Sequence, residues 1–527
     1  MAALSAAVTF PPSSVGARRR VRSRRRVAAR AFVDQTEDDA AGPAKTSTAT
    51  KPADAPTPDA PADDSYVETD DEVRERTMVG QLVRWCVERG ASGSGLSVRL
   101  PDGSGRGRGL EASRDVAEGE PVLSLPLEMG ICDYQDGHPP DSWDTMSNAP
   151  WGVRLACRLL QERAKFDDSE WAPYLALVPD AVPGSPLLWT DEEVLALQYP
   201  PAVAEAREMR EAVKTWHAKL EAACPSALAG ADVDAFAAAV SVVHSRTYGV
   251  ASAGGEGYFR ALLPLADLLN HAGDEYDAAA SAASSPATAP KWPPARAGDN
   301  IAWSTLDDDG TIEFAATRAV APGEEATMSY GERSNDHFLM YYGFTPPRNP
   351  HDDVVLFSDV EHALSWHMVY HPEMWDAGSE EEANTRESAA RAAVREVEKA
   401  LAETSDGDLA AAEPRFKVLP GGRCDARLVS LFAAAYAGTD EGVEGGKRVM
   451  DVDIESAHAD VARRCAELLR QMPTTLRQDD EKRRAEANDA TPGMAAATAY
   501  RAHKKEVLVD AIVNLGGDVV KLPDGYD

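Results

Sequence analysis

Two short segments about 200 residues apart share one pattern, and this echo constrains the fold more than any other feature of the chain. Residues 114–120 read Arg-Asp-Val-Ala-Glu-Gly-Glu, and residues 318–324 read Arg-Ala-Val-Ala-Pro-Gly-Glu. In both copies a turn leads into an apolar strand. Two copies are too few for a repeat array. They predict two similar hairpins in one β-rich domain, with a helical segment inserted between them.

The apolar periodicity changes twice along this domain. Residues 92–131 hold short apolar runs broken by Gly and Pro, which is typical of strands. Within 145–245, the expected insertion, apolar residues recur at helical spacing. Alternation of period two then returns around an Asp309-Gly310 turn, which predicts another hairpin. Helices are predicted within the insertion at 191–198, 202–222 and 232–246.

The N-terminal segments have the composition of targeting and linker sequence. Residues 1–33 carry eight arginines and no acid, which predicts an organellar transit peptide; a basic nucleic-acid-binding arm is the alternative. Residues 34–75 hold few large apolar side chains, so a disordered acidic linker is expected. Order is expected near Met78, at the start of a domain covering 76–347. Residues 278–298 have low complexity and are expected to form a surface loop.

The chain after residue 350 is dominated by helical periodicity interrupted by Gly- and Asp-rich breaks. This pattern predicts a separate all-α domain at 350–527. Its helices are predicted at 380–403, 425–437, 454–471 and 495–515.

Charge and cysteine content exclude several classes of protein. A net charge of −33 repels phosphate backbones, so we expect no nucleic-acid partner. The six cysteines form no CxxC pair, which argues against a zinc module and a disulfide framework and fits a reducing compartment. No stretch reaches the roughly 18 apolar residues of a membrane helix, so we expect no membrane partner.

Several common catalytic motifs are also missing from the sequence. The alternating glycines at 103–109 fit no G-x-G-x-x-G register, and Gly445-Gly446-Lys447 lacks the spacing of a P-loop. The motifs H-E-x-x-H and G-x-S-x-G do not occur, and the H-x-E at His371-Pro-Glu373 has no CxxC pair to accompany it. Dinucleotide-dependent, P-loop, metal-hydrolase, deaminase and α/β-hydrolase chemistries therefore lose their usual support.

Three patches far apart in the chain carry the strongest signal. They are Gly105-Arg-Gly-Arg-Gly-Leu110, the run Leu263-Pro-Leu-Ala-Asp-Leu-Leu-Asn-His271, and Met328-Ser-Tyr-Gly-Glu-Arg-Ser-Asn335 with Tyr341-Tyr-Gly-Phe344. In order and separation they resemble the SET-domain methyltransferases, particularly the branch of the Rubisco large-subunit lysine methyltransferases. Three further segments resemble that branch: Trp171-Ala-Pro-Tyr-Leu175 with Pro186-Leu-Leu-Trp189, Ser245-Arg246, and Pro473-Thr-Thr-Leu476.

This resemblance covers roughly residues 78–515 and implies an α+β fold. It implies a β-rich knotted SET domain with a helical insertion, followed by an all-α substrate-binding domain. It also implies S-adenosylmethionine as methyl donor, no metal, and a protein partner that bears the target lysine. The expected activity is protein-lysine N-methylation.

The resemblance assigns Tyr330 as the catalytic residue, because a tyrosine hydroxyl can orient an uncharged amine for attack on the methyl. Lysine, with a pKa of about 10.4, must lose its proton first, and an apolar channel favours that loss. By the same resemblance the channel and substrate contacts are Arg246, Tyr342 and Phe344. The expected cofactor-binding residues are Arg106, Gly107, Arg108, Ser245, Arg246, Asp267, Asn270, His271 and Tyr330.

Each of these residues also has a plainer interpretation. The Gly-rich segment alone would be an exposed β-turn, and the Asn-His pair alone would satisfy a buried turn. Without the other motifs, Tyr330, Tyr342 and Phe344 would be interpreted as aromatic residues of a core. Arg246 alone would be interpreted as part of a surface salt bridge. The order and combination of the patches favour the functional interpretation.

Two other functions stay open. A related branch methylates histidine in actin, although Ala266 beside Asp267 resembles the small wall of lysine-acting members. A catalytically silent binding module, which docks a partner through its helical domain, is the third hypothesis. The transit peptide and the resemblance together favour the chloroplast stroma over the mitochondrion. They point to the Rubisco large subunit or fructose-bisphosphate aldolase as substrate.

Overall fold

The structure is a computed structural model that describes residues 69–101, 107–133, 143–251, 258–276, 295–304, 310–376, 379–404, 414–437, 450–485, 489–517 and 519–526. The expected transit peptide at 1–33 and most of the expected linker lie outside the described residues. So do Arg106 and residues 277–294, which include most of the expected surface loop.

A helix starts before Met78, where the apolar pattern predicts the first ordered residues. Helix α1 spans Asp70–Glu88, and its N-cap Thr69 forms a capping box with Glu72. The box satisfies backbone N–H groups at the helix start, so a polar first turn is helical without apolar residues. The prediction that 34–75 is linker is therefore wrong for residues 70–75.

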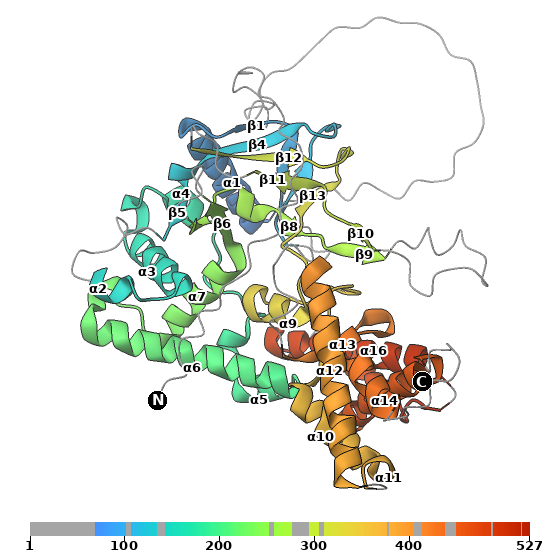
Figure 1. Ribbon diagram of the computed structural model, residues 1–527. Helices are drawn as coiled ribbons and strands as arrows, with labels where there is room; N and C mark the ends of the chain where they lie inside the picture. Colours follow the sequence, from blue (N-terminus) through green and yellow to red (C-terminus); the bar gives the residue numbers. More distant parts are fainter. Residues whose placement is uncertain are drawn as a thin grey trace, which may run out of the picture.

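Three small sheets make up the strand-rich part of the molecule (Figure 1). The first has the strand order β1-β4-β12-β11, the second β2-β3-β13-β8, and the third β5-β7-β6. A two-stranded ribbon, β9–β10, extends from the same part. The strands are β1 Ser92–Gly93, β2 Leu96–Arg99, β3 Gly109–Ala112, β4 Pro121–Pro126, β5 Ile131–Cys132, β6 Thr247–Ala251, β7 Tyr258–Leu262, β8 Asn270–His271, β9 Asp274–Tyr276, β10 Ala295–Ala297, β11 Ile301–Trp303, β12 Thr311–Ala316 and β13 Glu325–Met328.

The two copies of the sequence echo lie against each other. Val116 and Val320 form an antiparallel bridge in which each N–H donates to the other's carbonyl at 3.0 Å. The flanking turns carry equivalent ion pairs, Arg114–Glu120 at 2.6 Å and Arg318–Glu324 at 2.7 Å. The prediction of two similar turns in one β-rich unit is confirmed, and the bridge joins them directly.

The second predicted hairpin is also present. Strands β11 and β12 pair antiparallel, with Trp303 opposite Phe314. Gly310 adopts a φ of 79°, a left-handed conformation that glycine enters without a steric penalty. Asp309 lies outside the described residues.

Helices predominate in residues 143–246, between the two echo copies. The long ones start and end within a few residues of the predicted bounds. Helix α3 packs on α7 and on strands β5 and β7, while α5 lies beside the C-terminal helix α16 (Figure 1). The helices of this segment are α2 Trp143–Met146, α3 Trp151–Arg163, α4 Ala172–Leu175, α5 Asp191–Leu195, α6 Pro200–Ala223 and α7 Val233–Arg246.

The C-terminal part is mainly helical, but the prediction that it is all-α is wrong. A three-stranded sheet joins β14 Val354–Phe357, β15 Phe416–Leu419 and β16 Arg423–Cys424. Strands this short resemble buried helix segments in sequence, so periodicity alone does not distinguish them. The helices are α9 Asn335–His337, α10 Val360–Tyr370, α11 Pro372–Trp375, α12 Glu380–Thr404, α13 Ala426–Ala437, α14 Met450–Gln471, α15 Leu476–Ala485 and α16 Pro492–Leu515.

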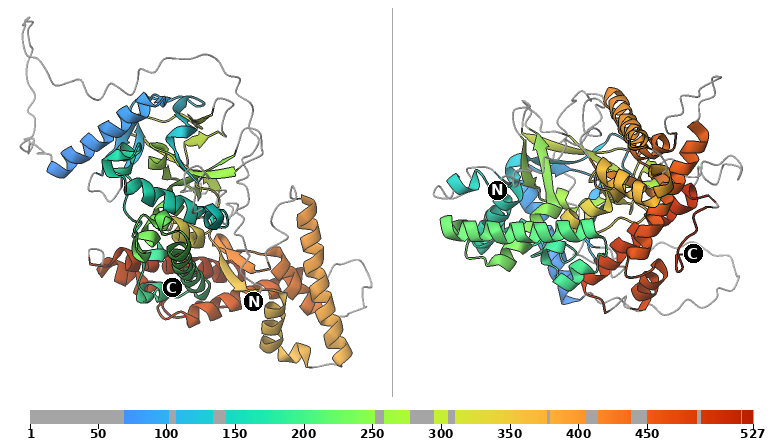
Figure 2. Two further views of the ribbon diagram at one scale, coloured as in Figure 1. Left: turned by 90° about the vertical axis from the view of Figure 1, so that its left-hand side faces the viewer. Right: turned by 60° about the horizontal axis from the view of Figure 1, so that its bottom comes forward.

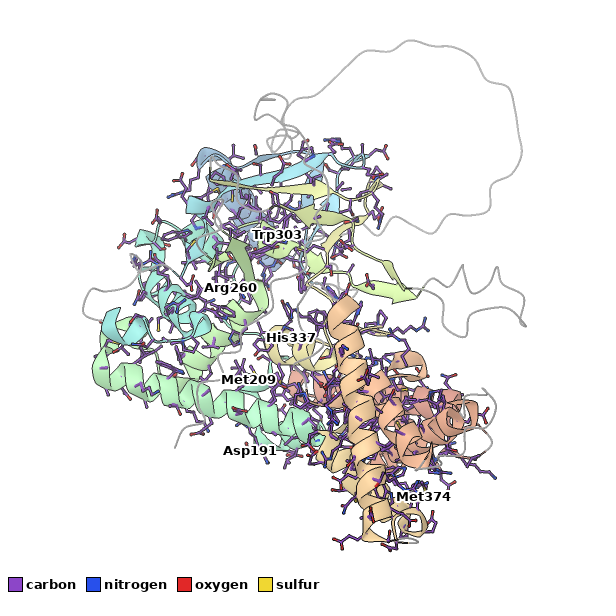
Figure 3. All side chains as sticks on the ribbon, in the orientation of Figure 1. Asp191, Met209, Arg260, Trp303, His337 and Met374 are labelled. Atoms are coloured by element: carbon purple, nitrogen blue, oxygen red, sulfur yellow. The ribbon has the colours of Figure 1, made fainter. Side chains whose placement is uncertain are left out.

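The buried apolar side chains form two clusters, one in each part of the molecule. In the left view of Figure 2 the strand-rich part lies above the C-terminal helical part. The helical segment between the echo copies contributes to both, because Val194 and Ala202 belong to the C-terminal cluster while Val240 belongs to the other. Met209, labelled in Figure 3, packs against both clusters. The two parts are therefore joined by packed apolar surface.

None of the helices in the described part has the length and apolarity needed to cross a membrane. All six cysteines are free thiols, and five of them are buried.

Candidate active site

The three sequence patches meet at strand β13. Ala326 pairs antiparallel with Leu110, which ends the Gly-rich patch. On its other edge β13 runs parallel to β8, with Thr327 opposite Asn270 and Met328 opposite His271. Tyr330 follows two residues after the strand. Segments more than 150 residues apart are thus brought into one region, as the resemblance predicts.

The Asn270 amide ties the Gly-rich patch to this region. Its Nδ2 donates to the Arg108 carbonyl at 3.1 Å and to Glu325 Oε1 at 2.7 Å. Arg99 holds the same carboxylate at 2.9 Å. A Cβ at Gly109 would lie 2.8–2.9 Å from these three side chains, so only glycine fits there without displacing them. Gly109 is therefore explained by packing alone.

The neighbouring glycine has no such packing role. A Cβ at Gly107 would meet no atom within 4 Å, so this backbone faces open space. The guanidinium of Arg108 pairs with Glu75 at 2.8 Å and donates to the Leu177 carbonyl at 2.7 Å. The Arg108 side chain thus anchors α1, which leaves only its backbone for a ligand. Arg106 lies outside the described residues.

Tyr330 is fixed at both ends. Its hydroxyl donates to the Leu269 carbonyl at 2.8 Å, and its backbone N–H donates to His271 Nδ1 at 3.2 Å. Because Nδ1 accepts, the neutral imidazole carries its proton on Nε2. Burial lowers the pKa of His271 to about 4. Burial and the neighbouring Tyr342 raise the pKa of Tyr330, so its hydroxyl stays protonated at neutral pH.

Aromatic rings surround Tyr330. Tyr342 stacks on it with 5.0 Å between ring centroids, and Phe344 approaches edge-on at 6.5 Å. Phe338 lies against His271 at 4.6 Å. Phe338 and Tyr342 belong to a π-helical turn that continues α9, and such turns are frequent at functional sites. Phe344 is 37% exposed, so the cluster reaches the surface.

Arg246 and Asp267 form a partly buried ion pair behind the aromatic cluster. Arg246 Nη1 donates to the Asp267 carbonyl at 3.1 Å and to Oδ2 at 3.2 Å, and the Tyr174 hydroxyl donates to Oδ2 at 3.0 Å. Burial raises the pKa of Asp267, and Arg246 and Tyr174 oppose that shift by stabilising the carboxylate. Arg246 Nε is buried without a hydrogen-bond partner.

Leu265, just before Asp267, has a strained backbone. Its φ of 67° is left-handed, a conformation that a branched side chain rarely adopts. Such residues cost about 1–3 kcal/mol and persist only where the surroundings impose them. In this conformation the chain enters the short turn Ala266–Leu268, which presents Asp267 to Arg246.

The remaining predicted residue, Ser245, shows no contact with this group. Its hydroxyl donates to the Val242 carbonyl one turn earlier in α7. The structure therefore brings together Gly107, Arg108, Asn270, His271 and Tyr330 in one region. It also places Tyr342, Phe344, Arg246 and Asp267 beside them. Their functional roles stay predictions.

Four residues of this region were not identified from the sequence: Tyr174, Tyr248, Leu269 and Glu325. Tyr248 donates to the Ala266 carbonyl at 2.6 Å. Leu269 acts through its carbonyl, which leaves no trace in the sequence. Tyr174 lies within the quoted Trp171–Leu175 segment, and Glu325 comes three residues before Met328-Ser-Tyr. Tyr174 and Glu325 therefore lie in or next to segments that carry the resemblance.

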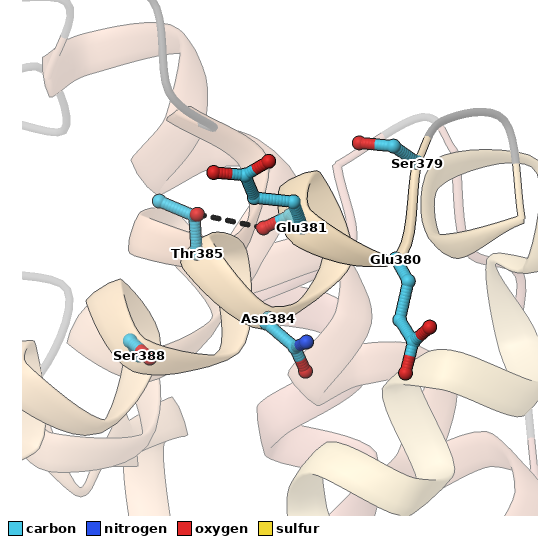
Figure 4. A pocket seen from close by; sticks show the side chains of 6 residues that line it. All are labelled: Ser379, Glu380, Glu381, Asn384, Thr385 and Ser388. Carbon is cyan, nitrogen blue, oxygen red and sulfur yellow. Dashed lines mark hydrogen bonds between the residues drawn. The ribbon is translucent and has the colours of Figure 1, made fainter.

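Two surface hollows occur elsewhere in the described residues. One lies at the start of α12, lined by Ser379, Glu380, Glu381, Asn384, Thr385 and Ser388 (Figure 4). The other lies between α10, α14 and the C-terminal segment. Neither contains a predicted site residue. The first is lined by residues of one exposed helix start, so its position does not bear on the candidate chemistry.

A cluster of His367, His371 and Asp460 has the composition of a metal site but not the hydrogen bonding of one. The Trp375 indole N–H, which can only donate, points to His367 Nδ1 at 3.0 Å. The His367 proton is therefore on Nε2, the atom that faces Asp460 at 3.4 Å, and a protonated nitrogen is not a ligand. Asp460 is also bound by Arg463.

Comparison with solved structures identifies the fold. The structure of Rubisco LSMT bound to AdoMet matches with a TM-score of 0.53, 18% identity, and coverage of 85% of this chain and 95% of that one. The SET domain of LSMT bound to MeLysine and AdoHcy matches with a TM-score of 0.55, 18% identity, and coverage of 85% and 94%. The chain therefore has an α+β SET-domain fold with a helical C-terminal region, as predicted.

The curated relatives are methyltransferases with a named target. Actin-histidine N-methyltransferase from Xenopus tropicalis is 28% identical over 287 residues, which cover 52% of this chain and 44% of that protein. The same enzyme from Homo sapiens is 28% identical over 285 residues, covering 52% and 43%. The matched part is thus less than half of these relatives. No protein-family profile matches the chain.

Proposed function

We propose that this protein is an S-adenosylmethionine-dependent protein methyltransferase that modifies a lysine side chain of another protein. The observation that carries the proposal is Tyr330. Its protonated hydroxyl is fixed by Leu269 next to Asn270 and His271, and aromatic rings surround it. The SET-domain fold and the methyltransferase relatives support the same class of reaction.

The residues present fit the methyl donor. The open space beside Gly107 would admit a ligand against the backbone, and the unpartnered Arg246 Nε leaves a buried donor unused. When bound, S-adenosylmethionine supplies an activated methyl group on a sulfonium. Gly107, the backbone of Arg108, Asn270 and His271 would hold it. No residue near Tyr330 is needed as a metal ligand in this chemistry.

Tyr330 would act by orienting the acceptor nitrogen rather than by removing its proton. Its hydroxyl is protonated and donates to Leu269, so the oxygen retains lone pairs that accept a hydrogen bond from an amine. His271 is a weak base whose Nδ1 is already occupied. The amine therefore loses its proton to water before transfer, and the aromatic walls favour the uncharged form.

Histidine is the second candidate acceptor. The curated relatives named above are actin-histidine methyltransferases, and they are more similar in sequence than the LSMT structures. Ala266, fully buried beside Asp267, supports lysine by its resemblance to the small wall of lysine-acting members. Fragmentation mass spectrometry of the methylated product decides between them: a methyl on imidazole would replace lysine with histidine in the proposal.

We propose the chloroplast stroma as the location, with the Rubisco large subunit or fructose-bisphosphate aldolase as substrate. The acid-free composition of residues 1–33 supports the location. A fluorescent fusion of residues 1–75 tests it directly, and mitochondrial or cytosolic fluorescence would contradict it.

The activity itself is tested by incubating the full-length protein with radiolabelled S-adenosylmethionine and stromal extract. A labelled protein band is expected, and the Tyr330→Phe variant should give a far weaker one. Calorimetry with S-adenosylhomocysteine separates the alternatives. Cofactor binding without any labelled acceptor would contradict the substrate, whereas no cofactor binding would favour a silent binding module.

A further inference from the structure

Lys504, on helix α16, is a fully buried lysine whose ammonium reaches the segment that follows Tyr330. Its Nζ lies 2.7 Å from Asp352 Oδ1 and 3.2 Å from Asp336 Oδ1, and it donates to the Asp353 carbonyl at 2.6 Å. One ammonium thus joins the C-terminal helix to both ends of the segment 335–353.

Asp352, which binds Lys504, also binds the turn that follows Tyr330. Its Oδ1 also accepts the backbone N–H of Asn335 at 3.0 Å. Asn349 Nδ2 donates to Asn335 Oδ1 at 3.0 Å and to the Arg333 carbonyl at 2.7 Å. These bonds close the segment into a loop held from inside by side chains. Asn335 and Asn349 are both buried, so water does not replace the bonds.

Asp336, the other carboxylate near Lys504, lies on the helix that leads to the aromatic cluster. It lies in the first turn of α9 and accepts a hydrogen bond from the hydroxyl of Tyr500, another α16 residue. Helix α9 continues directly into the π-helical turn that carries Tyr342. The position of the ring stacked on Tyr330 therefore depends on where α16 holds α9.

We propose that Lys504 is a positioning residue for methyl transfer, which sets the place of Tyr342 against Tyr330 from the C-terminal helix. This inference rests on the proposed function. Without the ammonium, two carboxylates would face each other with Tyr500 as the only donor on the α16 side. Their repulsion would separate α9 from Asp352 and shift the rings that flank the acceptor nitrogen.

The chain supplies a matched control in the next residue. Lys505 is equally buried on the same helix, but its ammonium binds Asp479 and Thr474. A longer contact reaches Gln198 at 3.5 Å. None of these partners lies between Tyr330 and Asp353. Loss of Lys505 therefore removes a buried ion pair of the same kind without touching the aromatic cluster.

The experiment compares Lys504→Met, Lys505→Met and the milder Tyr500→Phe in the full-length protein. We expect Lys504→Met to lower kcat about 10-fold or more, since small misplacements of reacting groups cost that much. Its affinity for S-adenosylmethionine should stay within about twofold, because Asn270 and Gly107 are not in the network. Tyr500→Phe should lower kcat in the same sense but less. Lys505→Met should lower the unfolding temperature while leaving kcat within about twofold.

Hydrogen exchange of residues 335–344 gives a readout that needs no substrate. Faster exchange in Lys504→Met than in Lys505→Met supports the proposal. Equal exchange and equal kcat in the two variants would overturn it. If Lys504→Met does not fold, Tyr500→Phe decides: unchanged kcat and unchanged exchange in it would also overturn the proposal. An unaltered protein that binds no S-adenosylmethionine would refute the proposed function instead, and the exchange result would still decide whether Lys504 positions Tyr342.

Discussion

The acceptors that bind the side chains around Tyr330 differ in charge from the acceptor that binds Lys505 and Arg501 in the helical part. In the strand-rich part, the Tyr330, Asn270 and Tyr248 side chains donate to main-chain carbonyls. In the helical part, Lys505 and Arg501 both bind the fully buried carboxylate of Asp479. Loss of a donor leaves a neutral carbonyl, whereas loss of Asp479 leaves two buried cations. Substitution of Asp479 in the helical part should therefore mainly lower stability, whereas substitution of Tyr330 in the strand-rich part should mainly lower activity.

The largest expected effect comes from Asp479→Asn. Removing one partner of a buried ion pair costs about 3–5 kcal/mol, because the remaining charges stay out of water. Lys505 and Arg501 would both lose their carboxylate. Thermal unfolding followed by circular dichroism should show a fall of several degrees.

The adjacent Asp480→Asn is the matched control. Asp480 is about one-third exposed and pairs with Arg483 on the same helix. Exposed pairs contribute about 0–1 kcal/mol, so the unfolding temperature should hardly move. Similar losses in both variants would refute the contrast between the two parts.

Tyr330→Phe tests the other side of the comparison. We expect kcat to fall about 100-fold, since the hydroxyl that would orient the acceptor is gone. Stability should change by about 0.5–1.5 kcal/mol, the net value of one hydrogen bond. Methylation assays and thermal unfolding on the same sample measure both quantities. A loss of stability that matches the loss of activity would mean that the hydroxyl is structural.

Ser245→Ala is the control for this prediction. The Ser245 hydroxyl is bonded within its own helix, so activity should stay within about twofold despite the assignment of this residue from the resemblance. A large loss of activity would instead restore Ser245 to the site.

The sequence identified side chains within motifs, but not the main-chain carbonyls that those side chains bind. Tyr330, Asn270 and Arg246 carry distinctive side chains within motifs, so their types and order pointed to the site. Their partners Leu269 and Arg108 act through carbonyls, which every residue has. The sequence also does not indicate that Lys504 is buried, because a charged pair at 504–505 in a helical segment is typical of a solvated face. Its partner Asp352 is 152 residues away.

The fold shows the same limit in its short elements. Helices α6 and α12 were predicted within a few residues, because more than 20 residues of periodic sequence average out local exceptions. Strand β14 has four residues, which fit a helix turn as well as a strand. Its identity depends on pairing with β15, 60 residues further on, and no local pattern records that partner.

Lowering the pH should reduce the free energy of unfolding through His244 in one pH range and through Asp460 in a lower one. Burial, with a contribution from Arg260, lowers the pKa of His244 to about 4, while the unfolded value is about 6.5. Between these values the unfolded chain binds a proton that the folded chain does not, so stability falls as the pH falls. From pH 7 to 5 the expected loss is about 2 kcal/mol at about 1.4 kcal/mol per pKa unit.

Asp460 in the helical part should lose its contribution to stability at a lower pH than His244 does. Burial disfavours its carboxylate, but hydrogen bonds from His367, Tyr436 and His371 outweigh that and lower its pKa to about 2. Its contribution is present above about pH 3.8 and is lost only as the pH falls from there towards 2. Urea unfolding at pH 7 and 5 should show a smaller loss in His244→Phe and an unchanged loss in Asp460→Asn. The reverse order would refute the assignment.

The smallest effect should come from the ion pairs of the two echo turns. Arg114 and Arg318 are nearly half exposed, so each pair with Glu120 or Glu324 should contribute about 0.2–1 kcal/mol. Glu120→Gln and Glu324→Gln should therefore lower stability by similar small amounts, because the two turns carry equivalent bonds. Both carboxylates also accept a backbone N–H, from Ala117 and Ala321, and an amide oxygen preserves that bond. A loss above about 2 kcal/mol in either variant would place a structurally decisive ion pair in the strand-rich part, and the contrast with Asp479 would no longer hold.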